Sequence, residues 1–310
     1  MEIAVIVDGI SPAQRDFYPW FRYAAQLGEH GWQLHFFEGE TLPTAFERRF
    51  DAMMLHVWLD WLNPKLFEPR RTMRTLERYA VYRAEYPETV QIILNHTDMS
   101  RRPYATIYWR RGDPVLYRTP AYDRAELDPF PAETIWPFEK VWGAPVFASA
   151  AEDLPYAAGF IGRISGPKGY RERVARETAK VGLGICSSER PYSKQEYSQL
   201  MARCRIAVCP RGWGEQSARH WDAWRSGKPV LTDRDCDAVE MIPGLRLQAG
   251  VHYLIFEEPE QIPDLVRYWT APARAEALAE IGRQGQRAAE SYDPLDNLLR
   301  FFRHALASER

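Results

Sequence analysis

Residues 205–233 combine a strand pattern, a glycine-bearing loop and a helix start in one segment. An apolar run at Ile206–Cys209 predicts the strand, and Gly212 and Gly214 mark the loop after it. Ser217 is a suitable N-cap for the helix that follows. A helix that begins directly after such a loop presents unpaired backbone N–H groups and the positive end of its dipole. The segment is therefore typical of a site that binds a phosphate or a diphosphate.

Charged and polar side chains surround the same loop. Arg211 and Arg219 can add charge-assisted hydrogen bonds to a phosphate. Asp222 follows one turn into the helix, where a carboxylate can accept hydrogen bonds from two ribose hydroxyls. Glu215 and Gln216 complete the loop. On the residues alone, an ordinary strand–helix–strand unit with solvated charges remains an alternative.

A second cationic loop precedes this segment. Residues 159–169 read GFIGRISGPKG and lie between a predicted strand and a predicted helix. Arg163 and Lys168 are separated by five positions in this glycine-punctuated loop, so both cations can converge on one anion. Basic residues in a solvated turn are the alternative interpretation.

The first half of the chain offers a different kind of group. His96 and Asp98 follow a predicted strand at 90–94, and residues 8–11 follow the first strand of the chain. Ligands of doubly wound sheets bind beyond the carboxyl ends of the strands. A histidine beside a carboxylate can serve there as a general base, whereas a structural loop histidine is an equal alternative.

Strands and helices alternate along both halves, and these elements would position the groups above. The run IAVIV at 3–7 is typical of a buried parallel strand. Further strands are predicted at 32–37, 52–57, 90–94, 158–161, 183–186, 206–209, 229–232 and 254–256, with helices at 17–31, 69–86, 170–180, 194–202 and 218–226. This alternation predicts an α/β protein with doubly wound sheets, and the irregular residues 100–146 indicate a domain boundary near their end.

The bulk composition excludes several classes of protein. The 310 residues carry a formal net charge of -2, which argues against nucleic-acid binding by charge alone. No basic leader precedes the first strand, and no apolar run reaches the roughly 18 residues that a membrane span needs. The four cysteines include no C-x-x-C pair, so neither a disulfide framework nor a zinc site is indicated and a cytoplasmic location is expected.

The pattern S-x-R-x-x-D-A-x-x-x-G-K-P-V-L-T-D, from Ser217 to Asp233, resembles the donor-binding signature of GT-B glycosyltransferases of the group 1 and spore-maturation-like kind. The resemblance extends over about residues 158–290. It implies two Rossmann-like doubly wound domains that face a cleft, with the acceptor domain at 1–145 and the nucleotide-sugar donor domain at 146–290. A last helix at 291–310 would cross back to the first domain.

The resemblance also implies roles for individual residues. Asp222 would bind the nucleotide ribose, Arg163 and Lys168 would hold the donor diphosphate, and His96 would contact the transferred sugar. Tyr192 would stack on the base. The full expected donor-binding set is Arg163, Lys168, Tyr192, Arg211, Gly212, Gly214, Glu215, Gln216, Ser217, Arg219 and Asp222, and the expected catalytic set is His96, Asp98, Arg163 and Lys168.

One position departs from the family pattern. Retaining members carry two acidic residues eight positions apart, but Gly214 stands eight before Asp222 and Glu215 stands seven before it. The expected function is a metal-independent glycosyltransferase that uses a nucleoside-diphosphate sugar, has no permanently bound cofactor and acts on an unknown acceptor. A catalytically silent module that binds a nucleotide sugar or a protein, and a nucleotide-sugar epimerase, remain alternatives.

Overall fold

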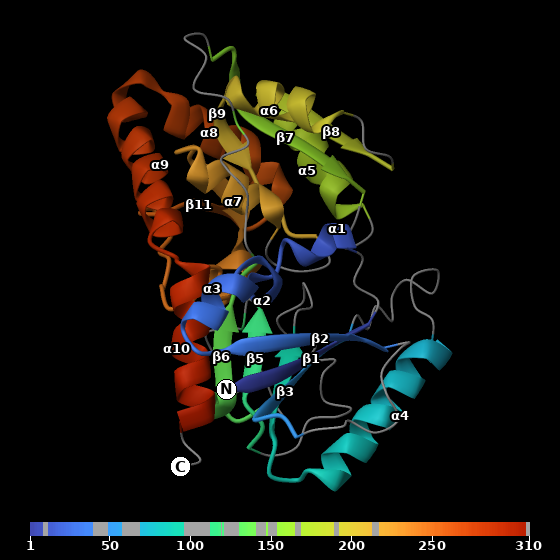
Figure 1. The fold of residues 1–310 in the computed structure, drawn as a ribbon. Coiled ribbons are helices and arrows are strands. Elements are labelled where there is room, and N and C mark those ends of the chain that lie inside the picture. The colour runs from blue at the N-terminus through green and yellow to red at the C-terminus, as the bar shows by residue number, and fades with distance from the viewer. Residues whose placement is uncertain are drawn as a thin grey trace.

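The computed structural model describes residues 1–8, 12–39, 49–57, 69–95, 112–118, 120, 130–140, 147, 154–164, 169–188, 192–212 and 217–307. Within them the chain forms two parallel sheets, one in each half, with helices on both faces of each (Figure 1). The architecture is the predicted one, α/β with doubly wound sheets.

The first sheet has the strand order β2-β1-β3-β4-β5-β6, and all of its neighbours are parallel. Its strands are β1 (Glu2–Asp8), β2 (Gln33–Glu38), β3 (Ala52–Val57), β4 (Val90–Asn95), β5 (Val115–Arg118) and β6 (Ile135–Phe138). Successive side chains of β1 enter different cores: Ile3 and Val5 face α2 (Pro19–Arg22) and α3 (Ala24–Glu29), whereas Ala4 faces α4 (Pro69–Glu85). Burial on both faces explains why the strand is apolar without alternation.

The second sheet has the order β11-β10-β9-β7-β8 and is also parallel throughout. Its strands are β7 (Tyr156–Arg163), β8 (Gly182–Ser187), β9 (Cys204–Val208), β10 (Val230–Asp233) and β11 (Leu254–Phe256). One core joins it to α6 (Lys194–Ala202) and α7 (Ala218–Arg225), and another joins it to α5 (Tyr170–Ala179) and α8 (Ile262–Thr270). Helix α9 (Ala275–Glu290) contributes to both cores.

Helix α10 (Pro294–Ala307) ends the described chain and packs on the first sheet, beside β6 (Figure 1). Phe301 and Phe302 are fully buried in the core that also contains Ile3 and Val5. The Asn297 side chain accepts a hydrogen bond from the Trp136 indole, with a nitrogen–oxygen distance of 3.2 Å. The end of the chain therefore completes the hydrophobic core of its beginning.

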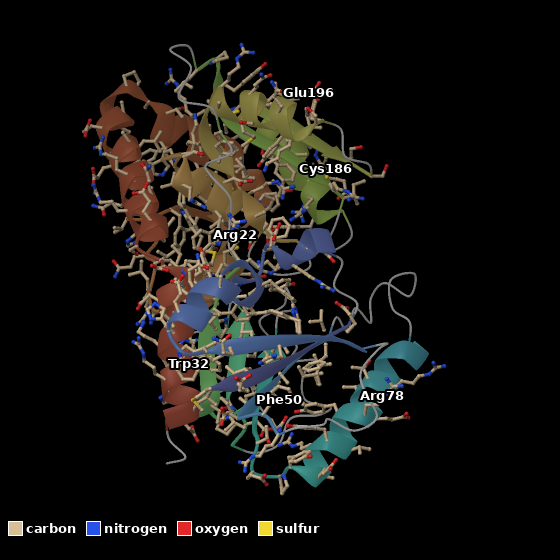
Figure 2. All side chains as sticks on the ribbon, in the orientation of Figure 1. Arg22, Trp32, Phe50, Arg78, Cys186 and Glu196 are labelled. Atoms are coloured by element: carbon tan, nitrogen blue, oxygen red, sulfur yellow. The ribbon has the colours of Figure 1, made fainter. Side chains whose placement is uncertain are left out.

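Tyr292 lies where the two halves meet. The Tyr292 hydroxyl accepts a hydrogen bond from the backbone N–H of Glu139 at 3.0 Å, and its ring lies 5.9 Å from that of Trp221 on α7. Figure 2 shows Arg22, at the end of α2, at the level of this junction. The remaining short elements are α1 (Pro12–Arg15) and the 3-10 helices Ala132–Thr134, Arg234–Ala238, Pro259–Gln261 and Pro272–Arg274.

The structure differs from the predicted elements in two places. The helix expected at 17–31 is two short helices, α2 and α3, because Tyr23 leaves the helical region with φ -111° and ψ 18°. The irregular segment also contains β6, which was not predicted because its IWPF sequence is only four residues long and includes Pro137. This strand pairs only with β5 and so lies at the sheet edge, where a proline is tolerated.

Candidate functional site

A pocket of about 320 Å³ opens at the carboxyl edge of the second sheet, where residues from three motifs meet. In Figure 2, Cys186 near the end of β8 and Glu196 in the first turn of α6 mark this edge. The lining residues are Ile161, Gly162 and Arg163 at the end of β7, Tyr192 and Tyr197 around the start of α6, and Ala218, Arg219 and Asp222 on α7. This is the edge at which doubly wound sheets bind ligands.

The loop before α6 is held by a capping box. The Ser193 hydroxyl accepts the backbone N–H of Glu196 at 3.2 Å, and the Glu196 carboxylate accepts the N–H of Ser193 at 2.8 Å. These bonds satisfy two of the backbone donors that a helix start leaves unpaired. Tyr192, directly before the cap, is thereby positioned at the pocket wall.

Arg219 is fixed against the floor of the pocket. Its Nε donates to the carbonyl oxygen of Ile161 at 2.9 Å, and its guanidinium lies 5.4 Å from the centre of the Phe160 ring. Gly162 makes this approach possible, because a Cβ there would lie 3.0 Å from the terminal nitrogen of Arg219 and 2.6 Å from the Phe160 ring. Strand β7 therefore holds the Arg219 side chain in place, in the same pocket as the exposed Arg163.

We expect Gly162→Ala to destabilise the fold by about 1–2 kcal/mol, because overpacking forces neighbouring side chains from their preferred rotamers. Urea unfolding of the parent and the variant measures this difference. Gly28→Ala in α3 is a matched control, since its Cβ would meet only Gln33 at 3.4 Å, an ordinary contact. A loss of stability in the control equal to that of Gly162→Ala would contradict the argument.

A buried histidine orders the start of α7. The Ser217 backbone N–H donates to Nδ1 of His220 at 3.1 Å, and Nε2 of His220 lies 2.9 Å from the Thr232 hydroxyl. Because that hydroxyl donates to the carbonyl oxygen of Cys209, it must accept from Nε2–H, which assigns the tautomer. Burial lowers the pKa of His220 to about 3, so the ring is neutral.

Asp222 is a partly buried carboxylate at the pocket wall. Burial raises its pKa to about 6, against the opposing effect of Lys194, Arg219 and Arg225. The surrounding cations therefore compensate only part of the cost of removing the charge from water. A ligand that donates hydrogen bonds to the ionised carboxylate would compensate the remaining desolvation cost.

Residues 146–295 match the sequence model of a protein family described as glycosyl transferase-like. The match lies within the second half of the chain and covers the whole of the second sheet. No curated protein sequence matches the chain. Among the described helices, none has both the length and the apolar composition that crossing a bilayer requires.

Solved structures similar to the chain are glycosyltransferases with the GT-B fold, and this chain has the same fold. HepE from Anabaena in complex with UDP-glucose has a TM-score of 0.58 and 13% identity, with 99% of this chain and 100% of that chain covered. Sucrose-phosphate synthase from Thermosynechococcus elongatus has a TM-score of 0.60 and 12% identity, with full coverage of both chains at 100%. A glycosyltransferase from Rickettsia africae has a TM-score of 0.56 and 9% identity, with 98% of each chain covered.

Of the residues selected from the sequence, the second half of the chain brings Arg163, Tyr192, Arg219 and Asp222 to one pocket. Arg211 is not among the lining residues. Its guanidinium pairs with Asp235 and lies 5.0 Å from the Tyr170 ring centre, and its backbone N–H donates to Asp233 at 2.6 Å. Gly212 and Ser217 are also outside the lining set, and Ser217 is the N-cap of α7, as predicted.

The second half of the chain also contains a cation that the sequence analysis did not select. Arg171, buried at the start of α5, donates to the backbone carbonyls of Arg211 at 2.8 Å and of Arg163 at 3.3 Å. Burial lowers the pKa of Arg171 to about 10, and the neighbouring Arg219 adds to this effect. The side chain links the two loops that flank the pocket. No local sequence pattern predicts this role, because the carbonyl groups that Arg171 contacts belong to residues distant in the sequence.

Several predicted residues lie outside the described residues: His96, Asp98, Lys168, Gly214, Glu215 and Gln216. The side chain of Asp8 and residues 9–11 are outside them as well. Within the described ranges, no group of three or more histidine, cysteine, aspartate or glutamate side chains is arranged to hold a metal ion.

Proposed function

We propose that the chain is a glycosyltransferase that moves a sugar from a nucleoside-diphosphate sugar to an acceptor. The observation that carries this proposal is the pocket, where Arg163, Tyr192, Arg219 and Asp222 converge from three separate motifs. Cations for phosphates and a carboxylate for ribose hydroxyls are the groups that a nucleoside diphosphate requires. The family match at 146–295 and the UDP-glucose bound by HepE support the same assignment.

In this proposal the cations act mainly on the leaving group. Arg163, Arg219 and Lys168 contact the diphosphate, which gains negative charge as the bond to the sugar breaks. Asp222 accepts the ribose hydroxyls and Tyr192 stacks on the base. The loop residues Arg211, Gly212, Gly214, Glu215, Gln216 and Ser217 complete the donor side, with backbone N–H groups at the start of α7 directed toward the phosphates.

The acceptor side is proposed for the first domain. His96 and Asp98 follow β4, and the proposal makes the pair a general base and a contact to the transferred sugar. The proposed division is an acceptor domain at 1–145, a donor domain at 146–290 and a crossing helix at 291–310. The reaction is proposed to need no metal and no permanently bound cofactor, because arginine and lysine neutralise the diphosphate.

A thermal-shift screen tests the donor assignment. UDP, GDP, ADP and CDP, and their sugars, are added at a concentration about 100 times their dissociation constant. A ligand that binds only the native state then stabilises it by about 2.7 kcal/mol. Hydrolysis or transfer of the sugar is measured with the best ligand. No stabilisation by any member of the panel would contradict the proposal.

A catalytically silent nucleotide-sugar-binding module is the second candidate, and Gly214 is the residue that favours it. Its position, eight before Asp222, is acidic in retaining enzymes that resemble this chain. A silent module would be stabilised by nucleotide sugars but would release no nucleoside diphosphate on prolonged incubation. Slow donor hydrolysis would exclude it.

Donor affinity should depend on pH between 5 and 7 if Asp222 binds the ribose. The pKa of Asp222 in the free protein is about 6, and only the ionised carboxylate accepts both hydroxyls. Affinity should therefore be nearly constant above pH 7 and fall about tenfold by pH 5, where most of the carboxylate is protonated. The raised pKa also means that Asp222 itself stabilises the free fold at low pH, and that this contribution is lost as pH rises from 3.8 to about 6.

The measurement is calorimetric titration with an intact sugar nucleotide. A terminal phosphate titrates near pH 6 and would obscure the effect, whereas the bridging phosphates of the sugar nucleotide do not. Asp222→Asn should bind more weakly at pH 7 and lose the pH dependence. If the affinity of Asp222→Asn fell between pH 7 and pH 5 as much as that of the parent, the pH dependence would belong to another group.

A further inference from the structure

Tyr197 has a polar atom that the described protein does not satisfy. The residue lies in the first turns of α6 and lines the pocket next to Tyr192. Its ring packs edge-on against Phe147, with 5.8 Å between ring centres. Its hydroxyl is buried, and no hydrogen-bond partner for it exists among the residues that the structure describes.

A hydroxyl in this position is unfavourable for the empty protein. Buried polar groups nearly always have a partner, since burial removes their hydrogen bonds to water. A residue that only filled space against Phe147 would need no hydroxyl, because phenylalanine has the same ring. The position on the pocket wall indicates that the missing partner is the molecule that occupies the pocket.

The surroundings of Tyr197 define the chemistry of that partner. Burial raises the pKa of Tyr197 far above its usual range, with a lowering effect of Arg219 and a raising effect of Asp222, so the hydroxyl keeps its proton and can donate. Arg219 and Asp222 both line the pocket with Tyr197, and Arg219 is already held by the carbonyl oxygen of Ile161. The charge of Asp222 makes its side of the pocket less favourable for a phosphate, and Tyr192 beside Tyr197 is the residue proposed to stack on the base. An oxygen or nitrogen acceptor of the nucleoside is therefore the partner that these surroundings favour.

We propose that Tyr197 determines nucleoside recognition, by donating a hydrogen bond from its hydroxyl to the ribose or the base of the sugar nucleotide. This proposal rests on the proposed function and adds a residue to it. The diphosphate is then recognised by Arg163 and Arg219, and the nucleoside by Asp222, Tyr192 and Tyr197. In this division, the arginines bind any diphosphate, whereas the other three residues select the nucleoside.

The test is Tyr197→Phe, which removes the hydroxyl alone. Calorimetry should show that its affinity for the preferred nucleoside diphosphate is about three- to tenfold weaker, the usual effect of one neutral hydrogen bond. Affinity for inorganic pyrophosphate, which lacks a nucleoside, should be unchanged. The melting temperature of the ligand-free variant should be equal to or above that of the parent, because the hydroxyl has no hydrogen-bond partner among the described residues. Tyr268→Phe, at a half-exposed tyrosine of α8 outside the pocket, is the matched control and should leave both affinities unchanged.

Three results would overturn the proposal. They are unchanged nucleoside diphosphate affinity in Tyr197→Phe, an equal loss of pyrophosphate affinity, and a lower melting temperature of the ligand-free variant, which would show a structural partner for the hydroxyl. The proposed function fails separately. A parent protein that binds no nucleoside diphosphate removes the donor site and this inference together, whereas parent binding with an unaffected Tyr197→Phe removes only the role of Tyr197.

Discussion

Arg163→Ala should lower the rate of sugar transfer or donor hydrolysis by about ten- to thousandfold, equivalent to about 1.4–4 kcal/mol of transition-state stabilisation. Arg163 is exposed at the end of β7, and its guanidinium has no partner among the described residues. It is therefore available to a ligand without first breaking an internal ion pair. The rate should fall by more than the affinity for the intact sugar nucleotide, because the diphosphate carries more charge in the transition state.

The comparison of rate with affinity separates catalysis from binding. Lys168→Ala should show the same imbalance, and Lys168→Arg should recover part of the rate, since a guanidinium does not reproduce the compact ammonium charge. Arg234→Ala removes an exposed arginine that pairs with Glu257 outside the pocket, and it should leave both quantities unchanged. An unchanged kcat in Arg163→Ala, with kcat/KM lowered only as much as the affinity, would indicate uniform binding and would remove its catalytic role.

Asp222→Ala should weaken binding of the sugar nucleotide by about 1–3 kcal/mol, the usual cost of losing a charged hydrogen-bond partner. Folding should be unchanged or slightly improved, because burial raises the pKa of this carboxylate to about 6 and its charge is not favoured in the free protein. Calorimetry of binding and urea unfolding of the same samples measure both effects.

A structural carboxylate would behave in the opposite way. If Asp222→Ala unfolded easily and the folded fraction kept its donor affinity, Asp222 would be a packing residue of α7. Asp264→Ala on α8 provides the matched control, since this exposed carboxylate pairs only with Arg267, three residues further on, among the interactions described. Its effect on both donor affinity and stability should be small.

The sequence predicts most strands because they are short and apolar, and β1 and β3 are also buried on both faces. Strand β3 and helix α6 have the predicted bounds. The pocket residues Arg163, Arg219 and Asp222 could be selected because a strand, a glycine loop and a helix start place them locally. Helix breaks such as that at Tyr23 depend on tertiary packing and leave no clear local pattern.

The residues that were missed act across the fold. Arg171 bonds to carbonyls 8 and 40 positions away in the chain, so no local spacing reveals it. His220 occupies the capping-box position where a glutamate is usual. Its ring is held there by a hydrogen bond to Thr232, 12 positions further on, which the local sequence does not reveal. Tyr197 has the pattern of an ordinary core tyrosine, and only the unsatisfied hydroxyl distinguishes it.

The packing of α10 has a consequence for the order of folding during synthesis. Phe301 and Phe302, close to the end of the described chain, are buried with Ile3 and Val5 near its beginning. These residues leave the ribosome about 300 positions apart, so the first sheet emerges early but lacks one wall of its core until α10 has been made. The second sheet needs α9 for both of its cores, and α9 is made before α10. The first sheet is therefore expected to complete its core after the second, and truncation before α10 should expose the apolar face of β1 to solvent.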